Sequence, residues 1–174
     1  MGFVCLPGGF GTLDETFELL TLTQTGKGTP VPIVFLDVPG DPYWRTIDQM
    51  VRDQLVSRGY VGAGDPNLYL ITDDPVRAAA EITGFYRNYR SLRYVGETLV
   101  VRLRQAPDDH QLALLNDHFG HLCREDDIHR AQPFAPERKD DDTLDAARIA
   151  FVFDKHGYSD LRALIDMCNS FITV

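Results

Sequence analysis

Three short apolar runs without a polar interruption constrain the fold of this chain more than any other feature of its sequence. The runs are residues 2–6 (GFVCL), 32–36 (PIVFL) and 68–71 (LYLI). A strand buried on both faces shows a continuous apolar stretch of this length, whereas a strand with one wet face alternates apolar and polar residues. The three runs therefore predict a parallel sheet that is covered on both sides.

Apolar residues at helical spacing follow each of the three runs. Two of these segments begin with the pairs Asp41-Pro42 and Asp74-Pro75, and Asp at the N-cap with Pro in the first turn is typical of a helix start. The order strand, helix, strand, helix, strand, helix is typical of an α/β protein. The predicted helices are residues 12–24, 41–55 and 74–89.

The pattern changes after Ser91. Residues 97–104 (ETLVVRLR) alternate apolar and polar side chains, which predicts a strand with one solvated side. Residues 132–142 (QPFAPERKDDD) contain two Pro residues and a charge run, which favour a solvated loop. We therefore predict an α/β region at residues 1–91 and a small α+β appendage at residues 92–174.

The appendage contains three further predicted elements. Asp108 is a candidate cap for a helix that extends to about residue 123, and Asp109, Asp126 and Asp127 are interpreted as surface charges. Ser159 is the predicted N-cap of the last helix. The three elements are a helix at residues 108–123, a strand at 148–153 and a helix at 159–171.

The composition is that of an acidic globular protein. Of 174 residues, 17 are Lys or Arg and 26 are Asp or Glu, so the formal net charge is −9 with His counted as neutral. This charge argues against binding to nucleic acid polymers, which requires a basic surface. Apolar runs stay well below the roughly 18 residues of a membrane span, and the three Cys residues show no C-x-x-C spacing. We expect a cytoplasmic protein that binds no membrane.

The segment that carries chemistry is residues 7–15 (PGGFGTLDE), between the first predicted strand and the first predicted helix. Ligands of α/β proteins lie at the carboxyl ends of the strands, where unpaired helix amides point outward. Glycines there let the backbone approach an anion closely, and a phosphate is the natural occupant. The segment matches neither the dinucleotide fingerprint, because Asp14 stands where the third Gly is needed, nor the P-loop.

A second interpretation of the same segment is structural. Thr12 and Glu15 have the spacing of a capping box, in which each side chain satisfies a backbone amide of the other residue, and three glycines can simply form a tight turn. The residues alone therefore leave two alternatives open, a phosphate cradle and a turn with a helix cap.

The string PGGFGTLDE closely resembles the PGGxGTxxE signature of the LOG (Lonely Guy) family of nucleoside 5′-monophosphate phosphoribohydrolases, long labelled lysine decarboxylases. The strings PIVFLD, DPYW and LYLITDDP are also similar to the family, so the resemblance covers about residues 1–90. It implies a Rossmann-like parallel sheet. It also implies that Gly8, Gly9, Gly11 and Thr12 bind the substrate phosphate and that Glu15 is catalytic at the ribose.

One departure accompanies the resemblance. Members of the LOG family carry, before this motif, another strand-helix unit and a helix with an Arg-Lys pair whose Arg is counted as catalytic. This chain starts at Met1, after the position of that unit, so the resemblance implies an N-terminally truncated sheet. No Arg of the sequence stands in a matching context. A fragment, a misassigned start codon and a degenerate copy are three explanations that stay open.

The implied reaction is hydrolysis of the N-glycosidic bond of a nucleoside 5′-monophosphate to free base and ribose 5-phosphate, with cytokinin ribotides or ordinary nucleotides as substrates. The alternatives are a non-catalytic nucleotide-binding module that lacks the catalytic Arg, and an interaction domain in which residues 7–15 form only a turn and a cap. We expect a homodimer, because the family is dimeric or larger and a three-strand sheet leaves apolar faces to cover.

Aromatic, His and Lys residues outside this segment are candidates either for function or for an ordinary structural role. Tyr43 and Trp44 are candidates for stacking on a base, or for the core. His118 and His121 lie three residues apart with Cys123 and His129 nearby, whereas metal-binding helices usually place a pair four residues apart. We therefore expect no metal. We also expect no cofactor, because no Lys has a context that suggests a Schiff base.

Overall fold

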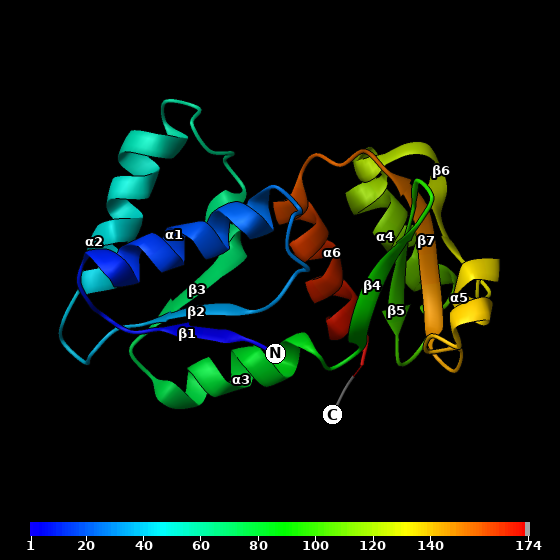
Figure 1. The fold of residues 1–174 in the computed structure, drawn as a ribbon, viewed down its shortest axis with the longest axis horizontal. Helices are drawn as coiled ribbons and strands as arrows, with labels where there is room; N and C mark the ends of the chain where they lie inside the picture. Colours follow the sequence, from blue (N-terminus) through cyan, green and yellow to red (C-terminus); the bar gives the residue numbers. More distant parts are fainter. Residues whose placement is uncertain (173–174) are drawn as a thin grey trace. The chain divides into compact units, whose positions relative to one another are not determined.

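The computed structural model describes residues 1–172, which form two compact units (Figure 1). The first unit consists of Met1–Gly84 and Gly157–Arg162, and the second of Phe85–His156 and the described residues from Ala163 onward. A parallel sheet forms in the first unit and an antiparallel sheet in the second. The predicted α/β class with a Rossmann-like parallel sheet is therefore confirmed, whereas the domain boundary at residue 91 stays a prediction.

The parallel sheet consists of the three predicted strands. They are β1 (Phe3–Cys5), β2 (Ile33–Leu36) and β3 (Tyr69–Thr72), in the spatial order β1-β2-β3. Ile33 and Val34 of the central strand are fully buried, as expected for a strand with helices on both faces. Within residues 1–172, β1 pairs only with β2, and Val4 is 44% exposed, so β1 forms an edge of the sheet.

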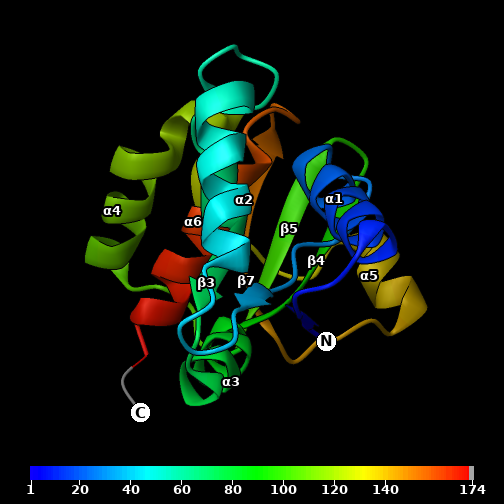
Figure 2. The ribbon, with the colours of Figure 1, turned by 90° about the vertical axis from the view of Figure 1, so that its left-hand side faces the viewer.

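Helices cover both faces of the parallel sheet. Figures 1 and 2 show α1 and α2 over one face and α3 over the other. The α2 helix continues as a π-helical turn, and a short 3-10 turn precedes β3. The helical elements of this unit are α1 (Phe10–Gln24), α2 (Tyr43–Met50), η1 (Val51–Val56), η2 (Asp65–Leu68) and α3 (Pro75–Phe85).

The boundaries of α2 and α3 differ from the predictions. Pro42 occupies the N-cap position of α2, although the Asp41 carboxylate accepts a hydrogen bond from the N–H of Tyr43 at 3.1 Å. The predicted extension of α3 to residue 89 is wrong, because the helix ends at Phe85 and Tyr89 begins a strand.

The second unit contains a four-stranded antiparallel sheet in the order β4-β5-β7-β6. The predicted strands at residues 97–104 and 148–153 are confirmed as β5 and β7. The β4 and β6 strands were not predicted. In β6 only Ile128 is buried, so the sequence of this strand shows little apolar pattern. The strands are β4 (Tyr89–Val95), β5 (Thr98–Leu103), β6 (Cys123–Arg130) and β7 (Ala147–Phe153).

The helices that follow β5 correct two predictions and confirm a third. Residues 132–142 are no solvated loop, because α5 forms within them, and Ser159 lies inside α6 and is not its N-cap. The predicted cap at Asp108 is confirmed, since it forms a capping box with Gln111. The helical elements are α4 (Asp109–Phe119), η3 (Gly120–Leu122), α5 (Ala135–Asp140) and α6 (Tyr158–Ser170), whose residues up to Arg162 belong to the first unit.

Both faces of β5 are buried, which contradicts the predicted solvated side. Leu99, Val101 and Leu103 face one way and are fully buried, and on the other face Val100 is fully buried and Arg102 is 4% exposed. Figures 1 and 2 show α4 on one side of the antiparallel sheet and α5 on the other. The alternating pattern therefore reflects an ion-pair layer under α5 and not contact with water.

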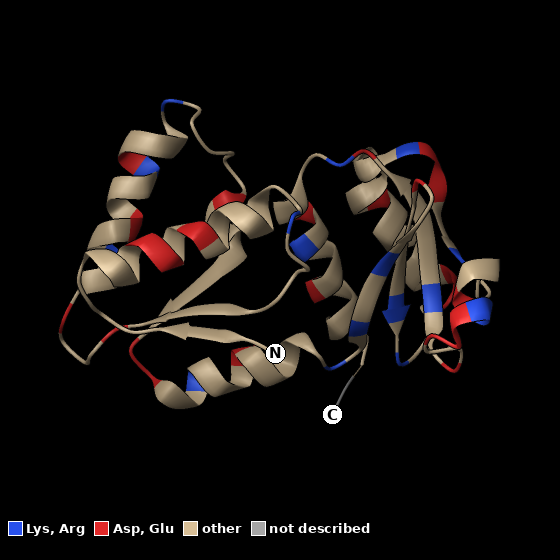
Figure 3. Ribbon diagram, in the orientation of Figure 1, with Lys and Arg blue, Asp and Glu red and all other residues tan. Residues whose placement is uncertain are grey.

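Paired charges join α5 to the sheet. Arg102 of β5 and Arg148 of β7 are partners in the strand register, and both donate hydrogen bonds to Oε1 of Glu137 in α5. Arg102 also donates to both carboxylate oxygens of Asp142, at 3.0 and 2.7 Å. Figure 3 shows basic residues on the strands and acidic residues at α5. Because an unpaired buried charge is strongly destabilising, loss of any one of Arg102, Arg148 and Glu137 would destabilise the fold.

The environment of Glu137 fixes its charge state. Its side chain is fully buried, which by itself raises the pKa of the carboxyl group. The N–H of Phe134 and the guanidinium groups of Arg102 and Arg148 outweigh this effect and lower the pKa below its ordinary value. Glu137 is therefore an anion at neutral pH.

No helix within residues 1–172 has the length and apolar character needed to cross a membrane.

Candidate active site

The glycine-rich loop connects β1 to α1. Gly9 is the N-cap of α1 in an extended conformation, and no side chain caps the helix. Thr12 is thus the third helical residue, and the predicted helix start at Thr12 and the capping box with Glu15 are both wrong. The N–H of Leu13 donates to the carbonyl oxygen of Gly9 at 3.2 Å, so the helical amides before it have no acceptor within the helix.

The glycines of the loop play two different structural roles. A Cβ atom at Gly8 would lie 2.2 Å from Oγ1 of Thr12, so only glycine fits there without movement of the helix. A Cβ atom at Gly9 or Gly11 has no atom of the described chain within 4 Å. The backbone at these two positions therefore faces open space, as an anion-binding loop requires.

One face of α1 and the edge strand β1 enclose a groove of about 420 Å³. Thr12 and Glu15 are three residues apart on α1, which places both side chains on the same helix face. Glu15 is exposed, and within residues 1–172 its carboxylate has no hydrogen-bond or ion-pair partner. The groove is lined by Phe3, Val4, Cys5, Leu6, Pro7, Thr12, Glu15, Thr16 and Leu19.

The structure thus brings the predicted site residues together at the carboxyl end of β1. Gly8, Gly9 and Gly11 form the loop, while Thr12 and Glu15 line the adjoining groove. The groove has the size of a small-molecule site, for which about 300–1,000 Å³ is typical. This arrangement is suited to an anion held by the amides and a neighbouring group presented to a carboxylate.

Tyr43 and Trp44, both candidates for base stacking, have separate roles. Trp44 is fully buried and its ring stacks on that of Phe35, with 4.4 Å between the ring centroids, so Trp44 is a core residue. Tyr43 is half-buried, and its hydroxyl donates a hydrogen bond to the carbonyl oxygen of Gly8 at 2.6 Å. Sequence reasoning missed this contact, because it joins residues 35 positions apart.

Asp37 lies at the carboxyl end of β2 and was not among the predicted site residues. It is 3% exposed, and its Oδ1 accepts a hydrogen bond from the backbone N–H of Trp44 at 2.8 Å. This contact fixes the start of α2 to the end of the central strand. The PIVFLD string placed Asp37 after a strand, but its acceptor role depends on the chain turning back to Trp44.

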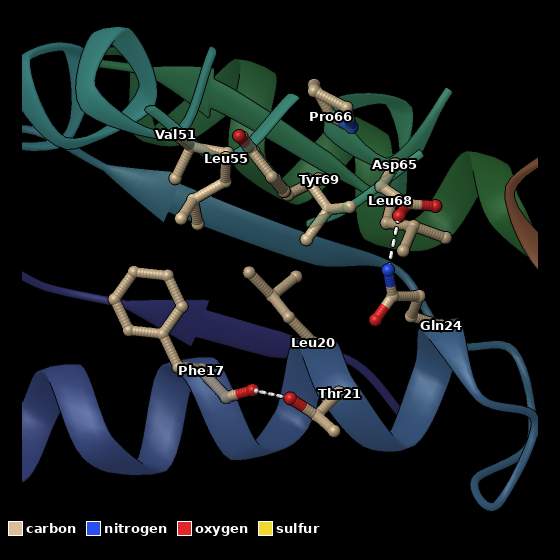
Figure 4. A pocket seen from close by; sticks show the side chains of 11 residues that line it. Phe17, Leu20, Thr21, Gln24, Val51, Leu55, Asp65, Pro66, Leu68 and Tyr69 are labelled. Atoms are coloured by element: carbon tan, nitrogen blue, oxygen red, sulfur yellow. Dashed lines mark hydrogen bonds between the residues drawn. The ribbon is translucent and has the colours of Figure 1, made fainter. Parts of the chain in front are cut away.

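A second, smaller cavity lies on another side of α1. Its volume is about 70 Å³, and Figure 4 shows mainly apolar side chains around it, with Gln24 hydrogen-bonded to Asp65. The π-helical turn η1 contributes Val51 and Leu55 to its wall. The cavity is too small for a nucleotide, so the groove between α1 and β1 is the candidate active site.

The thiols of the chain are poor nucleophiles. Burial raises the pKa of Cys168 to about 12, and burial with the nearby Asp127 charge raises the pKa of Cys123 to about 11. Burial also raises the pKa of Cys5 in the groove, although a hydrogen bond with Thr16 opposes the shift. Thiolate chemistry is therefore disfavoured at neutral pH.

The histidines that the sequence places near Cys123 do not assemble a metal site. In the part of the chain that the structure describes, no three His, Cys, Asp or Glu residues form a group suited to a metal ion. The Nδ1 atoms of His118 and His129 each lie 2.9 Å from a backbone carbonyl oxygen.

Comparisons with known proteins find similarity in the first half of the chain. The family model described as "Possible lysine decarboxylase" matches residues 1–82. The chain is 28% identical over 81 residues to the protein of Oryza sativa subsp. japonica named "Probable cytokinin riboside 5'-monophosphate phosphoribohydrolase LOG4". It is 38% identical over 56 residues to "Cytokinin riboside 5'-monophosphate phosphoribohydrolase LOG" of the same organism.

These alignments cover 47% and 32% of this chain. They cover 34% and 23% of the two rice proteins, so the chain spans about a third of the length of the curated relatives that it matches, or less. The matched region contains β1, α1 and the groove. The resemblance to the LOG family is therefore confirmed, and it lies within residues 1–82.

Proposed function

We propose that the groove between α1 and β1 binds a nucleoside 5′-monophosphate and belongs to a phosphoribohydrolase site. Water adds to C1′ of the ribose, the bond from C1′ to the base nitrogen breaks, and the base leaves with a proton. The products are free base and ribose 5-phosphate. The names of the two rice relatives support cytokinin ribotides as one substrate class.

The proposed roles of the residues follow from their places in the loop and the groove. The backbone at Gly8, Gly9 and Gly11 and the hydroxyl of Thr12 hold the phosphate, at the positive end of the α1 dipole. Binding of this remote group supplies energy that orients the ribose for the reaction. Glu15 faces the ribose and stabilises the positive charge that develops on the sugar as the bond to the base breaks.

The observation that carries the proposal is the open space beside Gly9 and Gly11 next to a groove lined by Thr12 and Glu15. A tight turn with a helix cap does not need such space. The absence of any side-chain cap on α1 also removes the main argument for a purely structural role of Thr12.

The test is the change Glu15→Gln. The amide keeps the shape of the side chain but removes its charge, so we expect hydrolysis of AMP or a cytokinin ribotide to fall by roughly 100-fold or more while nucleotide binding persists. Glu18→Gln is the matched control, because Glu18 is an exposed acid of α1 outside the groove lining. Equal turnover by wild type and Glu15→Gln would exclude Glu15 as the catalyst, and binding without turnover in the wild type would favour a non-catalytic module.

A further inference from the structure

Tyr43 holds the glycine-rich loop from outside the loop. It is the first residue of α2, and its hydroxyl donates a 2.6 Å hydrogen bond to the carbonyl oxygen of Gly8. A Cβ atom at Gly8 would lie 2.2 Å from Oγ1 of Thr12, so Thr12 of α1 leaves no room for a side chain at this position. Residues near the starts of two helices thus constrain Gly8.

The position of the Tyr43 hydroxyl is set by buried neighbours. The Tyr43 ring meets the Trp44 ring edge-on, with 5.0 Å between centroids and 89° between planes. Trp44 is fully buried on Phe35, and its backbone N–H is held by the Asp37 carboxylate. The donor that reaches Gly8 is therefore anchored to the core of the parallel sheet.

This hydrogen bond also determines where the next amide points. The carbonyl of Gly8 and the N–H of Gly9 belong to one planar trans peptide unit, in which the two groups point in opposite directions. Since the Gly8 carbonyl points to Tyr43, the Gly9 N–H points away from it. The Tyr43 hydroxyl also hydrogen-bonds the Gly8 carbonyl oxygen, whose partial negative charge would otherwise repel an approaching phosphate.

We infer that Tyr43 is a positioning residue for phosphate binding, which it supports by orienting the peptide unit between Gly8 and Gly9. The inference rests on the proposed function, because it assumes that the loop holds the phosphate. It assigns Tyr43 no contact with the substrate.

The test compares Tyr43→Phe with Tyr69→Phe, using ribose 5-phosphate as the probe. Tyr69 is the matched control, since its hydroxyl donates an equally short 2.6 Å hydrogen bond, to Asp48, and it lies outside the groove. We expect Tyr43→Phe to weaken binding roughly 3- to 10-fold, the effect of one hydrogen bond, and Tyr69→Phe to leave binding unchanged. Calorimetric titration measures the affinities, and thermal unfolding shows whether both variants fold.

A second measurement separates this inference from the proposed function. Hydrogen exchange of the Gly9 amide in the ligand-free protein should be faster in Tyr43→Phe than in wild type or Tyr69→Phe. If wild type binds ribose 5-phosphate, equal affinity of the two variants overturns the inference. If wild type binds none, the proposed phosphate site fails, and unchanged Gly9 exchange in Tyr43→Phe then overturns the positioning role as well.

Discussion

Neighbouring glycines of the loop at residues 7–15 differ in what requires the absence of a side chain. Gly8 is required by the protein itself, because any side chain there collides with Thr12. Gly9 is not required by the packing of the described chain, so its lack of a side chain matters for something that approaches from outside. This difference between two adjacent glycines gives the phosphate proposal a sharp test.

We predict that Gly9→Val abolishes binding of ribose 5-phosphate without loss of folding. The added side chain points into free space in the protein but fills the volume needed by the phosphate. Calorimetric titration measures binding, and circular dichroism with thermal unfolding measures folding. Gly59→Val is the control, because Gly59 also has no atom within 4 Å but lies outside the groove. Since the positive φ of Gly59 disfavours a side chain, that variant loses stability but keeps its affinity. Retained affinity in Gly9→Val would contradict the cradle.

Single residues of the site were predictable to different degrees. The motif made the loop and Glu15 candidates, because the spacing of residues in one segment is visible in a sequence, and their role as a site stays a prediction. The capping box was wrong, since the same Thr-x-x-Glu spacing also places two side chains on one face inside a helix. Tyr43 and Asp37 gained their roles only through contacts across the fold.

At the scale of elements, α5 is the part of the structure that differs most from its sequence pattern. It has only six residues, Pro133 precedes it and Pro136 lies in its first turn, and its charges are typical of a surface loop. The Arg residues that donate hydrogen bonds to Glu137 lie on two strands, 35 and 11 positions away, and the pairing depends on how these strands fold against α5. By contrast, continuous apolar runs predicted β1, β2 and β3, and burial on both faces accounts for the run at β2.

We predict that the ion pairs under α5 make the second unit less stable in acid. Hydrogen bonds from Arg102 and Arg93 hold the pKa of Asp142 at about 2, below its ordinary 3.8. A carboxylate with a lowered pKa stabilises the fold above its ordinary pKa, and this contribution is lost as the pH falls through the folded value. Urea unfolding between pH 5 and pH 2 should therefore show falling stability, most steeply below about pH 4.

The variant Asp142→Asn isolates this effect. It should be less stable than wild type at pH 5 and should lose less stability between pH 4 and pH 2. Asp117→Asn is the control, because Asp117 is 81% exposed and should leave both the stability and its pH dependence unchanged. Parallel pH curves for wild type and Asp142→Asn would mean that these ion pairs contribute nothing to the acid response.

At the scale of the whole molecule, the open edge of β1 leads to a prediction about assembly. Val4 and Leu6 are 44% and 58% exposed beside an unpaired strand edge, a combination that proteins usually cover. We therefore predict a homodimer, with a mass by light scattering of twice the 19.6 kDa of one chain. The change Val4→Lys, which places a charge at this edge, should shift the population toward monomer, and the exposed Val76→Lys on α3 should not. A monodisperse wild-type monomer would rule out the dimer.

The raised pKa values of the three thiols also determine how the protein can be labelled. Because Cys5, Cys123 and Cys168 hold their protons at neutral pH, maleimide dyes modify them slowly. A cysteine introduced at Phe10, which is 93% exposed at the beginning of α1, offers a far more reactive position. A fluorescent dye can therefore be attached beside the glycine-rich loop without first replacing the native Cys residues.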